Sequence, residues 1–412
     1  MLIFLLSILS LMAFGETCTE TLTIGEILNR SITHSIDINL KTDEIDIIRG
    51  HIIDAEKIYN PELEHFTTDG KQQGKTTIAS ETRLWFNFQL GNKRKYKGEV
   101  FRTQKDITKA ELEYMRLVLK KELFLAFIRN KQILNYYTRI DNIHNLIESF
   151  INRYQSIKFL TPEQKIEKNS LEISVVNLDL HKAELKNEIE LIGRFFQRMI
   201  RSECEITLKI NNPTNHNEWP EIQSKTYKGE NSLELKLADL ALSKSKFELK
   251  REEAMVWPDL KIGPMWQFNR LGSLDYNLYG VGLIFPIPSF NLNQGMKQAS
   301  RASITRNQKR YDYMLEQKRK EFDFRVKRYT DVLKEMKDYR KLNEFGDIIK
   351  ETRSLFNRGL ISIPIFLSYK NEFLEVLTRS QNLENILAQH LMEIYIINNE
   401  PLEEIGNSYL AI

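Results

Sequence analysis

The sequence predicts a mainly α-helical protein with a small β part, in which long antiparallel helical hairpins and two β-hairpins form an internal twofold repeat. Only 17 of the 412 residues are glycine and 10 are proline, while 28% are charged, a composition typical of long helices. Two stretches alternate apolar and polar side chains with the two-residue period of a strand. Landmarks around these stretches recur at one constant spacing, which indicates a duplicated unit.

The N-terminal stretch predicts export from the cytoplasm. Residues 2–14 are apolar but too few to span a membrane as a helix, so we expect residues 1–15 to be a signal peptide, although no Lys or Arg precedes the apolar run. The two cysteines, Cys18 and Cys204, could pair in an oxidising compartment, which the sequence alone does not establish. The residues before Cys18 lack the small side chains of a lipoprotein cysteine site, which argues against lipidation.

The first copy of the repeat is expected over residues 16–201. Apolar residues at helical spacing predict one helix over 23–60, which ends at a proline. A β-hairpin is expected over 61–90, with a strand over 62–68 and a loop over 69–77. Its second strand has an apolar and a polar face, as expected of a barrel strand beside a wet lumen. The apolar face carries Leu84, Phe86, Phe88 and Leu90, and the polar face carries Arg83, Asn87 and Gln89.

A long helix pair over 93–200 completes this copy. Its first helix, over 93–154, would be on the order of 90 Å long, more than a single globular core needs. Thr161 and Pro162 supply the cap and the first position of the second helix. A tight turn over 159–161 therefore joins two antiparallel helices.

The second copy is expected over 230–398, after a linker over 202–229 that contains a short strand. Its helix leads into a β-hairpin over 258–286 and a helix pair over 293–398, and a C-terminal tail occupies 399–412. In this hairpin Tyr279, Val281, Leu283 and Phe285 share one face.

A constant offset relates the two copies. Pro61 and Pro258 are 197 residues apart, as are Phe88 and Phe285. The same offset places the break at 358–359 on the helix start at 161–162. Three landmarks at one offset predict that the same supersecondary unit occurs twice.

The order of these motifs resembles the TolC-like outer membrane efflux protein family over essentially the whole chain after the expected signal peptide. The matching motifs are Asn60-Pro61-Glu62-Leu63, Trp257-Pro258-Asp259-Leu260, the second hairpin exit over 279–295, the tip over 358–362, and Leu90-Gly91-Asn92-Lys93-Arg94, which is similar to the heavy-metal cation efflux branch. The resemblance implies a homotrimer in which each chain adds four strands to a 12-stranded transmembrane β-barrel, while the helical hairpins form an α-barrel across the periplasm.

The resemblance also implies a function as a passive exit duct in the outer membrane of a Gram-negative bacterium, within a tripartite efflux or type I secretion system. Expected partners are a periplasmic adaptor (membrane fusion) protein, an inner-membrane transporter, which could be of the RND type, and outer-membrane lipid. The adaptor-docking tips would comprise Phe159, Leu160, Thr161, Arg358, Gly359, Leu360 and Ser362. The lipid-facing strand residues would be Leu84, Phe86, Phe88, Tyr279, Val281, Leu283 and Phe285. The substrate class, whether metal ion, drug or protein, stays open.

The segment after the second tip departs from the family pattern. Acidic residues often narrow the tunnel entrance of family members here, but this chain has no carboxylate between Ser362 and Glu372. An apolar constriction formed by Ile365 or Phe366 is one interpretation, and simple packing of these residues between helices is the other.

Other functions are not indicated. The net charge of +3 is small for this length and its charges are interspersed, so no nucleic-acid partner is expected. The seven histidines show no metal-ligand spacing and no catalytic or nucleotide-binding motif is present, so we expect no metal, no cofactor and no enzyme. Two competing interpretations are a soluble periplasmic or secreted coiled-coil protein and a cytosolic helical scaffold. The aromatic strand faces argue against the first and the duplicated hairpins against the second.

Overall fold

The computed structural model describes residues 18–72, 74–209, 219–222, 227–339, 351–352, 354–356, 358 and 360–402. The expected signal peptide, Gly359 and most of the expected C-terminal tail lie outside these residues. The chain divides into two compact units, and each combines segments from both copies of the repeat. Unit 1 comprises Met1–Asn39, Tyr114–Ser232 and Lys318–Ile412, and unit 2 comprises Leu40–Glu113 and Leu233–Gln317.

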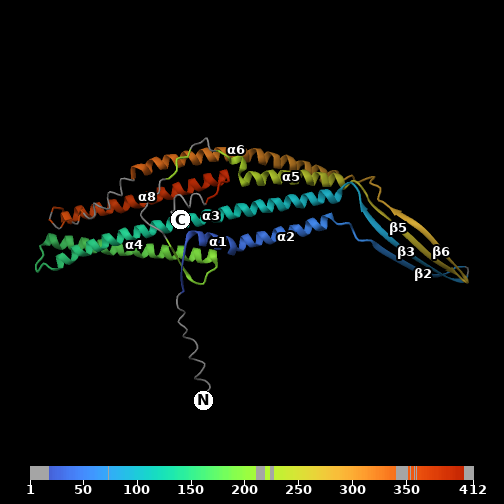
Figure 1. The fold of residues 1–412 in the computed structure, drawn as a ribbon, viewed down its shortest axis with the longest axis horizontal. Helices are drawn as coiled ribbons and strands as arrows, with labels where there is room; N and C mark the ends of the chain where they lie inside the picture. Colours follow the sequence, from blue (N-terminus) through green and yellow to red (C-terminus); the bar gives the residue numbers. More distant parts are fainter. Residues whose placement is uncertain are drawn as a thin grey trace, which may run out of the picture. The chain divides into compact units, whose positions relative to one another are not determined.

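Unit 2 contains a four-stranded antiparallel sheet (Figure 1). Its strands are β2 (Glu62–Gln72), β3 (Lys75–Gln89), β5 (Asp259–Leu271) and β6 (Leu274–Ile284). The spatial order is β2-β3-β5-β6, so the two hairpins meet through β3 and β5 while β2 and β6 form the edges. The sheet therefore joins strands of both copies of the repeat.

The first hairpin is longer than the sequence analysis predicts. Residues 69–77 were expected to form a loop, but Asp69 pairs with Ile78 and Gln72 pairs with Lys75. Gly74, in the turn between the two strands, has a φ of 77°, a conformation that tight hairpin turns require and glycine adopts easily. The expected loop was wrong because this stretch is polar, and polar residues suit a strand that has water on one side.

Four helices contribute to unit 2: α2 (Ile36–Glu56), α5 (Leu233–Ala254) and the N-terminal parts of α3 (Lys93–Gln155) and α6 (Gln294–Tyr339). The residues before α3 and α6, Asn92 and Asn293, have φ values of 61° and 59°. Asparagine tolerates this left-handed conformation better than most residues, so it suits the sharp change from strand to helix.

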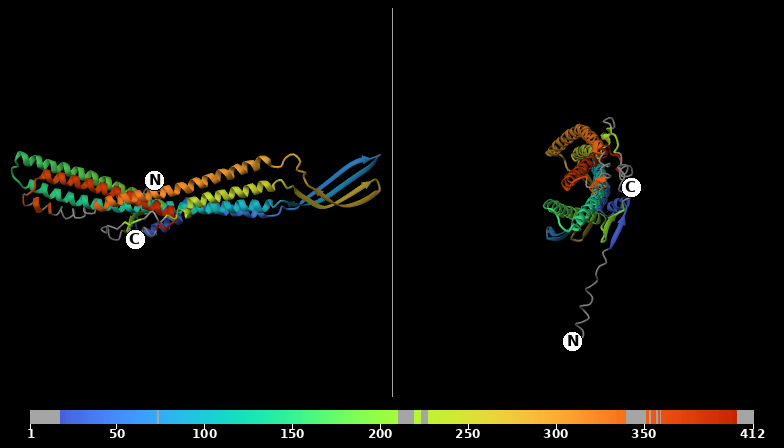
Figure 2. Two further views of the ribbon diagram at one scale, coloured as in Figure 1. Left: turned by 90° about the horizontal axis from the view of Figure 1, so that it is seen from above. Right: turned by 90° about the vertical axis from the view of Figure 1, so that its left-hand side faces the viewer.

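Unit 1 consists mainly of helices α1 (Ile24–His34), α4 (Pro162–Ile200) and α8 (Ile363–Asn398), with the C-terminal parts of α3 and α6. Figure 2 shows α4 lying antiparallel beside the C-terminal part of α3. The side chains of Arg129 and Glu188 join these two helices through two hydrogen bonds of 2.5 and 2.8 Å. A two-stranded parallel sheet pairs β1 (Thr19–Leu22) with β4 (Glu205–Leu208), and the short 3-10 helix η2 (Gly229–Asn231) follows.

The start of unit 1 corrects the single helix expected over 23–60. Ser35, with ψ 123°, is extended and separates α1 from α2. Thr23 caps α1, and its side chain and that of Glu26 form a reciprocal capping box. The apolar spacing continues through the break, so the pattern alone did not reveal it.

Two apolar clusters form the interior of unit 1. The first includes Ile27, Leu123, Phe124, Phe196 and Leu391, all at most 1% exposed. The second fills the space among α3, α4 and α8, and includes Ile140, Ile147, Phe150 and Leu171. Most members of both clusters are Leu and Ile, and phenylalanines such as Phe124 and Phe150 pack among them.

The described elements run twice through the order helix, two strands, long helix and helix. They are α2, β2, β3, α3 and α4, and then α5, β5, β6, α6 and α8. Within the described ranges, no helix combines the length and the apolar composition required to cross a membrane.

Two glycines permit close packing around Trp85: its ring lies against Gly282 of β6, and the β3 backbone beside it approaches Gly263 of β5. The ring is 4% exposed, and its Nε1 donates to Glu64 at 2.9 Å. A Cβ at Gly282 would lie 2.5 Å from the ring, and a Cβ at Gly263 would lie 1.7 Å from the carbonyl oxygen of Leu84. Because distances this short are not tolerated, both positions depend on glycine.

We predict that Gly263→Ala destabilises the sheet by about 1–3 kcal/mol or more, since the new methyl group meets rigid backbone. The thermal unfolding midpoint of the purified protein measures this effect. Gly280→Ala is the matched control, because its Cβ would meet only the flexible end of Met265, at 3.0 Å. Equal midpoints for the two variants would contradict the packing described above.

Lys370 is a buried cation in the second cluster. It is 7% exposed, and its Nζ donates to Ser174 Oγ at 2.7 Å. Burial lowers the pKa of Lys370, because the charged form loses hydration. No ion pair with Lys370 is formed within the described part of the chain, so the hydroxyl alone compensates the charge.

We predict that Lys370→Met raises the thermal midpoint at pH 7, because it removes a charge that the fold must desolvate. The folded pKa of Lys370 lies below its unfolded value of about 10.4. Below the folded pKa the amine is charged in both states, so the full cost of burying the charge opposes folding. Stability should therefore rise with pH between the two values in the natural chain, and less in the variant. Ser174→Ala, the control, should lower the midpoint. A lower midpoint for Lys370→Met would refute this.

Candidate membrane-facing sheet and helical tips

One face of the unit 2 sheet is apolar across its four strands. Because neighbouring strands are in register, Phe86 pairs with Ile262, and Ile262 pairs with Leu283. Trp266 and Tyr279 form another pair on this face. Large side chains here are exposed rather than buried: Leu63 71%, Phe86 41%, Phe88 47%, Trp266 43%, Tyr279 81%, Val281 74% and Leu283 57%. Toward the hairpin turns the same face carries polar groups: His65 bonds to Thr82 at 2.9 Å, and Arg270 donates to Asp275 at 2.8 Å.

The opposite face carries polar groups that bond across strands. Glu62 accepts from Lys261 at 2.6 Å and from Asn87 at 2.7 Å. Within β3, Arg83 also donates to Glu81 at 2.7 Å. Around Phe86 the sheet therefore has one apolar and one polar face, as the alternation in the sequence predicts, although Phe66 and Leu278 are also exposed on the polar side.

The predicted lipid-facing residues lie together on the apolar side. Leu84, Phe86, Phe88, Tyr279, Val281 and Leu283 occupy matching register positions, and Phe285, 51% exposed, follows directly after β6. The two tryptophans of the sheet lie on different faces: Trp85, which pairs with Glu62, on the polar face, and Trp266, which pairs with Tyr279, on the apolar face. Trp266 Nε1 donates to Asn277 at 3.1 Å, so the indole N–H has a hydrogen-bond partner on an otherwise apolar surface.

The edge strands of this sheet, β2 and β6, are each 11 residues long. Among the strands that the structure describes, each edge strand pairs on one side only. Long open edges are a template for pairing with another strand, and natural proteins normally block or pair them. The sheet of one chain is therefore incomplete.

The two predicted helical tips lie in unit 1. At the first tip, Thr161 caps α4 through a capping box with Gln164, and Phe159 is 85% exposed. At the second tip, Leu360 is 59% exposed and Ser362 precedes α8. Leu160 is half-buried, Thr161, Arg358 and Ser362 are exposed, and Gly359 lies outside the described residues.

An aromatic contact brings the two tips together. The ring of Phe150 on α3 lies 3.9 Å from that of Phe356, measured between centroids, and 5.3 Å from that of Phe366 on α8. Tyr154 Oη donates to Glu167 at 2.6 Å and joins α3 to α4. Burial and this hydrogen bond raise the pKa of Tyr154 to about 12, so the hydroxyl stays protonated and keeps donating at physiological pH.

The two residues predicted for an apolar constriction lie in different environments. Phe366 is 3% exposed and packs in the core with Phe150, which matches the alternative interpretation of helix packing. Ile365 is 61% exposed. The two residues therefore differ: Phe366 is a core residue and Ile365 is on the surface.

The sequence analysis missed an apolar stripe on α4. Ile166, Ile173 and Leu180 are seven residues apart, and Val176 lies between the last two; all four are 58–67% exposed. A seven-residue spacing is the signature of helices that pack side by side, so the signal was present in the sequence.

The sequence matches no family model and no curated protein. Solved structures are similar over most of the chain. The transmembrane channel CusC is 11% identical and has a TM-score of 0.73, with 92% of each chain covered. The MtrE outer membrane channel of Neisseria gonorrhoeae, in its open state, is 10% identical with a TM-score of 0.73, covering 92% of this chain and 89% of that one. The outer membrane protein VceC of Vibrio cholerae is 10% identical with a TM-score of 0.68, covering 91% and 96%.

At these identities the likeness establishes the fold. The predicted mainly helical fold with a small antiparallel sheet is confirmed, and this chain has the fold of the TolC-like outer membrane channels.

Proposed function

We propose that this chain is one subunit of a passive channel in the outer membrane of a Gram-negative bacterium. It would serve as the exit duct of a tripartite efflux or type I secretion system, and export what an inner-membrane pump delivers. The observation that carries this proposal is the two-faced sheet, whose large apolar side chains are exposed on one side while charged groups pair on the other. The similar solved structures, named as channels or outer membrane proteins, support it.

The open edges support a trimer. In lipid every backbone N–H and C=O needs a partner, so an open four-stranded sheet is not viable there. Three copies would join β2 of one copy to β6 of the next and close a barrel of twelve strands, a size observed in membrane barrels. The exposed stripe on α4 suits a helical contact with a neighbouring copy, because it has the spacing of a coiled-coil seam.

The tips suit adaptor docking. Phe159 and Leu360 expose apolar surface, and the contacts of Phe150 hold the two tips in one cluster. Exposed apolar residues on a rigid support are typical of protein interaction sites. If a constriction exists near the second tip, Ile365 is the residue that would form it.

The first test is fractionation of cells that express the full chain, followed by detergent extraction. We expect a heat-modifiable trimer in the outer membrane that conducts ions across a planar bilayer without nucleotide. Recovery as a soluble monomer or dimer would contradict the channel and favour a coiled-coil protein.

Adaptor docking predicts that Phe159→Ser combined with Leu360→Ser abolishes export and leaves the trimer and its conductance intact. Growth of the native host under candidate drugs and metal ions measures export, and tolerance should fall to that of the deletion strain. Lys158→Ser, in the same turn, is the matched control and should export normally. Full tolerance in the double variant would argue against docking at these tips.

A further inference from the structure

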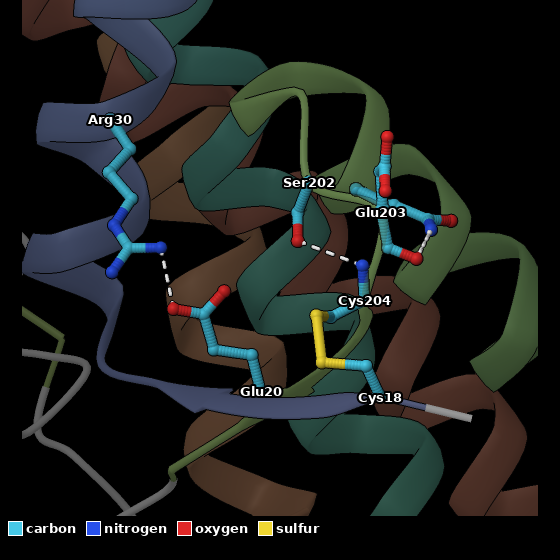
Figure 3. Close-up of a disulfide and its surroundings, with 7 residues drawn as sticks. Cys18, Glu20, Arg30, Ser202, Glu203 and Cys204 are labelled. Atoms are coloured by element: carbon cyan, nitrogen blue, oxygen red, sulfur yellow. Dashed lines mark hydrogen bonds and ion pairs between the residues drawn. A yellow bond between two sulfur atoms is a disulfide. The ribbon is translucent and has the colours of Figure 1, made fainter. Parts of the chain in front are cut away.

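A disulfide joins the only two cysteines of the chain. Cys18 and Cys204 are 186 residues apart in sequence, and their Cα atoms are 4.6 Å apart. The bond lies at the end of the parallel pair β1 and β4, next to the register pair of Thr19 with Glu205 (Figure 3). The disulfide that the sequence left open is therefore formed in the structure.

The contacts around the bond continue the strand pairing. The Glu205 N–H donates to the Cys18 carbonyl at 2.7 Å, and the Cys204 N–H donates to Ser202 Oγ at 3.1 Å. The strands themselves are only four residues long. Chain ends in such short strands fray unless something ties them down, and here the tie is covalent.

The bond stabilises more than the strand pair. β1 leads directly into the cap of α1, and Ile27 of α1 lies in the same core cluster as Ile206 of β4 and Phe196 of α4. Linking Cys18 to Cys204 closes the intervening chain into a covalent ring. The N-terminal strand and α1 thus stay near α4 even when the ladder opens.

The exposure and the bonding of the two cysteines determine which reactions they can undergo. Cys18 is exposed and Cys204 is half-buried, so the pair is accessible to another protein. The Cys18 sulfur is bonded to Cys204, so it cannot also carry a thioether-linked lipid. Disulfide formation and lipidation of Cys18 are mutually exclusive.

We propose that Cys18 and Cys204 are a substrate site for a thiol–disulfide oxidoreductase in the compartment that receives the exported chain. The Cys18 thiolate attacks the disulfide of the oxidised partner, which forms a mixed disulfide and releases one partner thiolate. The Cys204 thiolate then attacks the Cys18 sulfur and releases the second partner thiolate. Two electrons and two protons pass from the cysteines to the partner, which leaves as a dithiol. The inference rests on the export part of the proposed function and is independent of channel activity.

Two features set the order and the requirements of this reaction. Cys18 enters the oxidising compartment first, because export begins at the N-terminus, and it is the more exposed residue. With two cysteines only one intramolecular disulfide exists, so no wrong pairing within the chain needs correction. An oxidase is therefore required, and a disulfide isomerase is not.

The test follows the thiols of the full chain in three Gram-negative host strains: the parent, one without the periplasmic dithiol oxidase and one without the disulfide isomerase. After an acid quench, a polyethylene-glycol maleimide adds mass to each free thiol. We expect no addition in the parent and isomerase-deficient strains, and two additions on most of the protein in the oxidase-deficient strain. Cys204→Ser should accumulate several-fold more mixed disulfide with the oxidase than the control Cys18→Ser.

Complete oxidation without the oxidase would overturn the proposal, as would free thiols in the parent strain, a thioether lipid on Cys18, or equal trapping by both single variants. Fractionation of the same samples separates this result from the proposed function. An oxidised but soluble exported protein would contradict the channel and support the disulfide inference. An outer-membrane trimer with free thiols would do the reverse.

Discussion

The alternation of side chains along β3 and β5 is the constraint on which the rest of the structure depends. It gives one sheet an apolar face with Phe86, Phe88 and Val281 exposed, and a polar face where Glu62 joins Lys261. Removing each large apolar side chain from water stabilises a protein by about 1.5–3 kcal/mol. A face with this many uncovered apolar groups is costly in water and favourable in lipid, whereas the polar ion pairs require the opposite environment.

This constraint also explains the glycines and the edges. Trp85 is a large ring on the polar face, and it fits because Gly282 has no side chain to meet it, while Gly263 leaves room for the backbone carbonyl of Leu84. Among the described strands, β2 and β6 each pair on one side only, which is why the proposed barrel is closed by further copies of the chain. The exposed apolar face and the open edges of the sheet are the features that support the proposed closed assembly.

Much of this architecture could be predicted from the sequence, where local signals were strong. Thr161 and Pro162 marked the start of α4, and the period-two pattern around Phe86 assigned the correct face. The break at Ser35 could not be predicted, because apolar spacing continues across it. The pairing of β1 with β4 joins four-residue segments far apart in sequence, and strands this short depend on their tertiary partners.

In the candidate site, too, features with a local sequence signal could be predicted and features that depend on distant contacts could not. The strand residues were predictable from alternation, and their common face is observed. Phe366 was ambiguous because an apolar residue after a turn suits either a constriction or a core, and its contact with Phe150 depends on a helix more than 200 residues earlier in the chain. The α4 stripe at Ile166, Ile173 and Leu180 carried a readable heptad signal that was overlooked.

The central claim is that the apolar face meets lipid and the polar face meets water. Spin labels at Val281→Cys and Gln267→Cys, in the reconstituted full chain with its disulfide formed, test it directly. The label at 281 should be relaxed mainly by lipid-soluble oxygen, and the label at 267 mainly by a water-soluble nickel chelate. Strong relaxation of both labels by the nickel chelate would contradict the account.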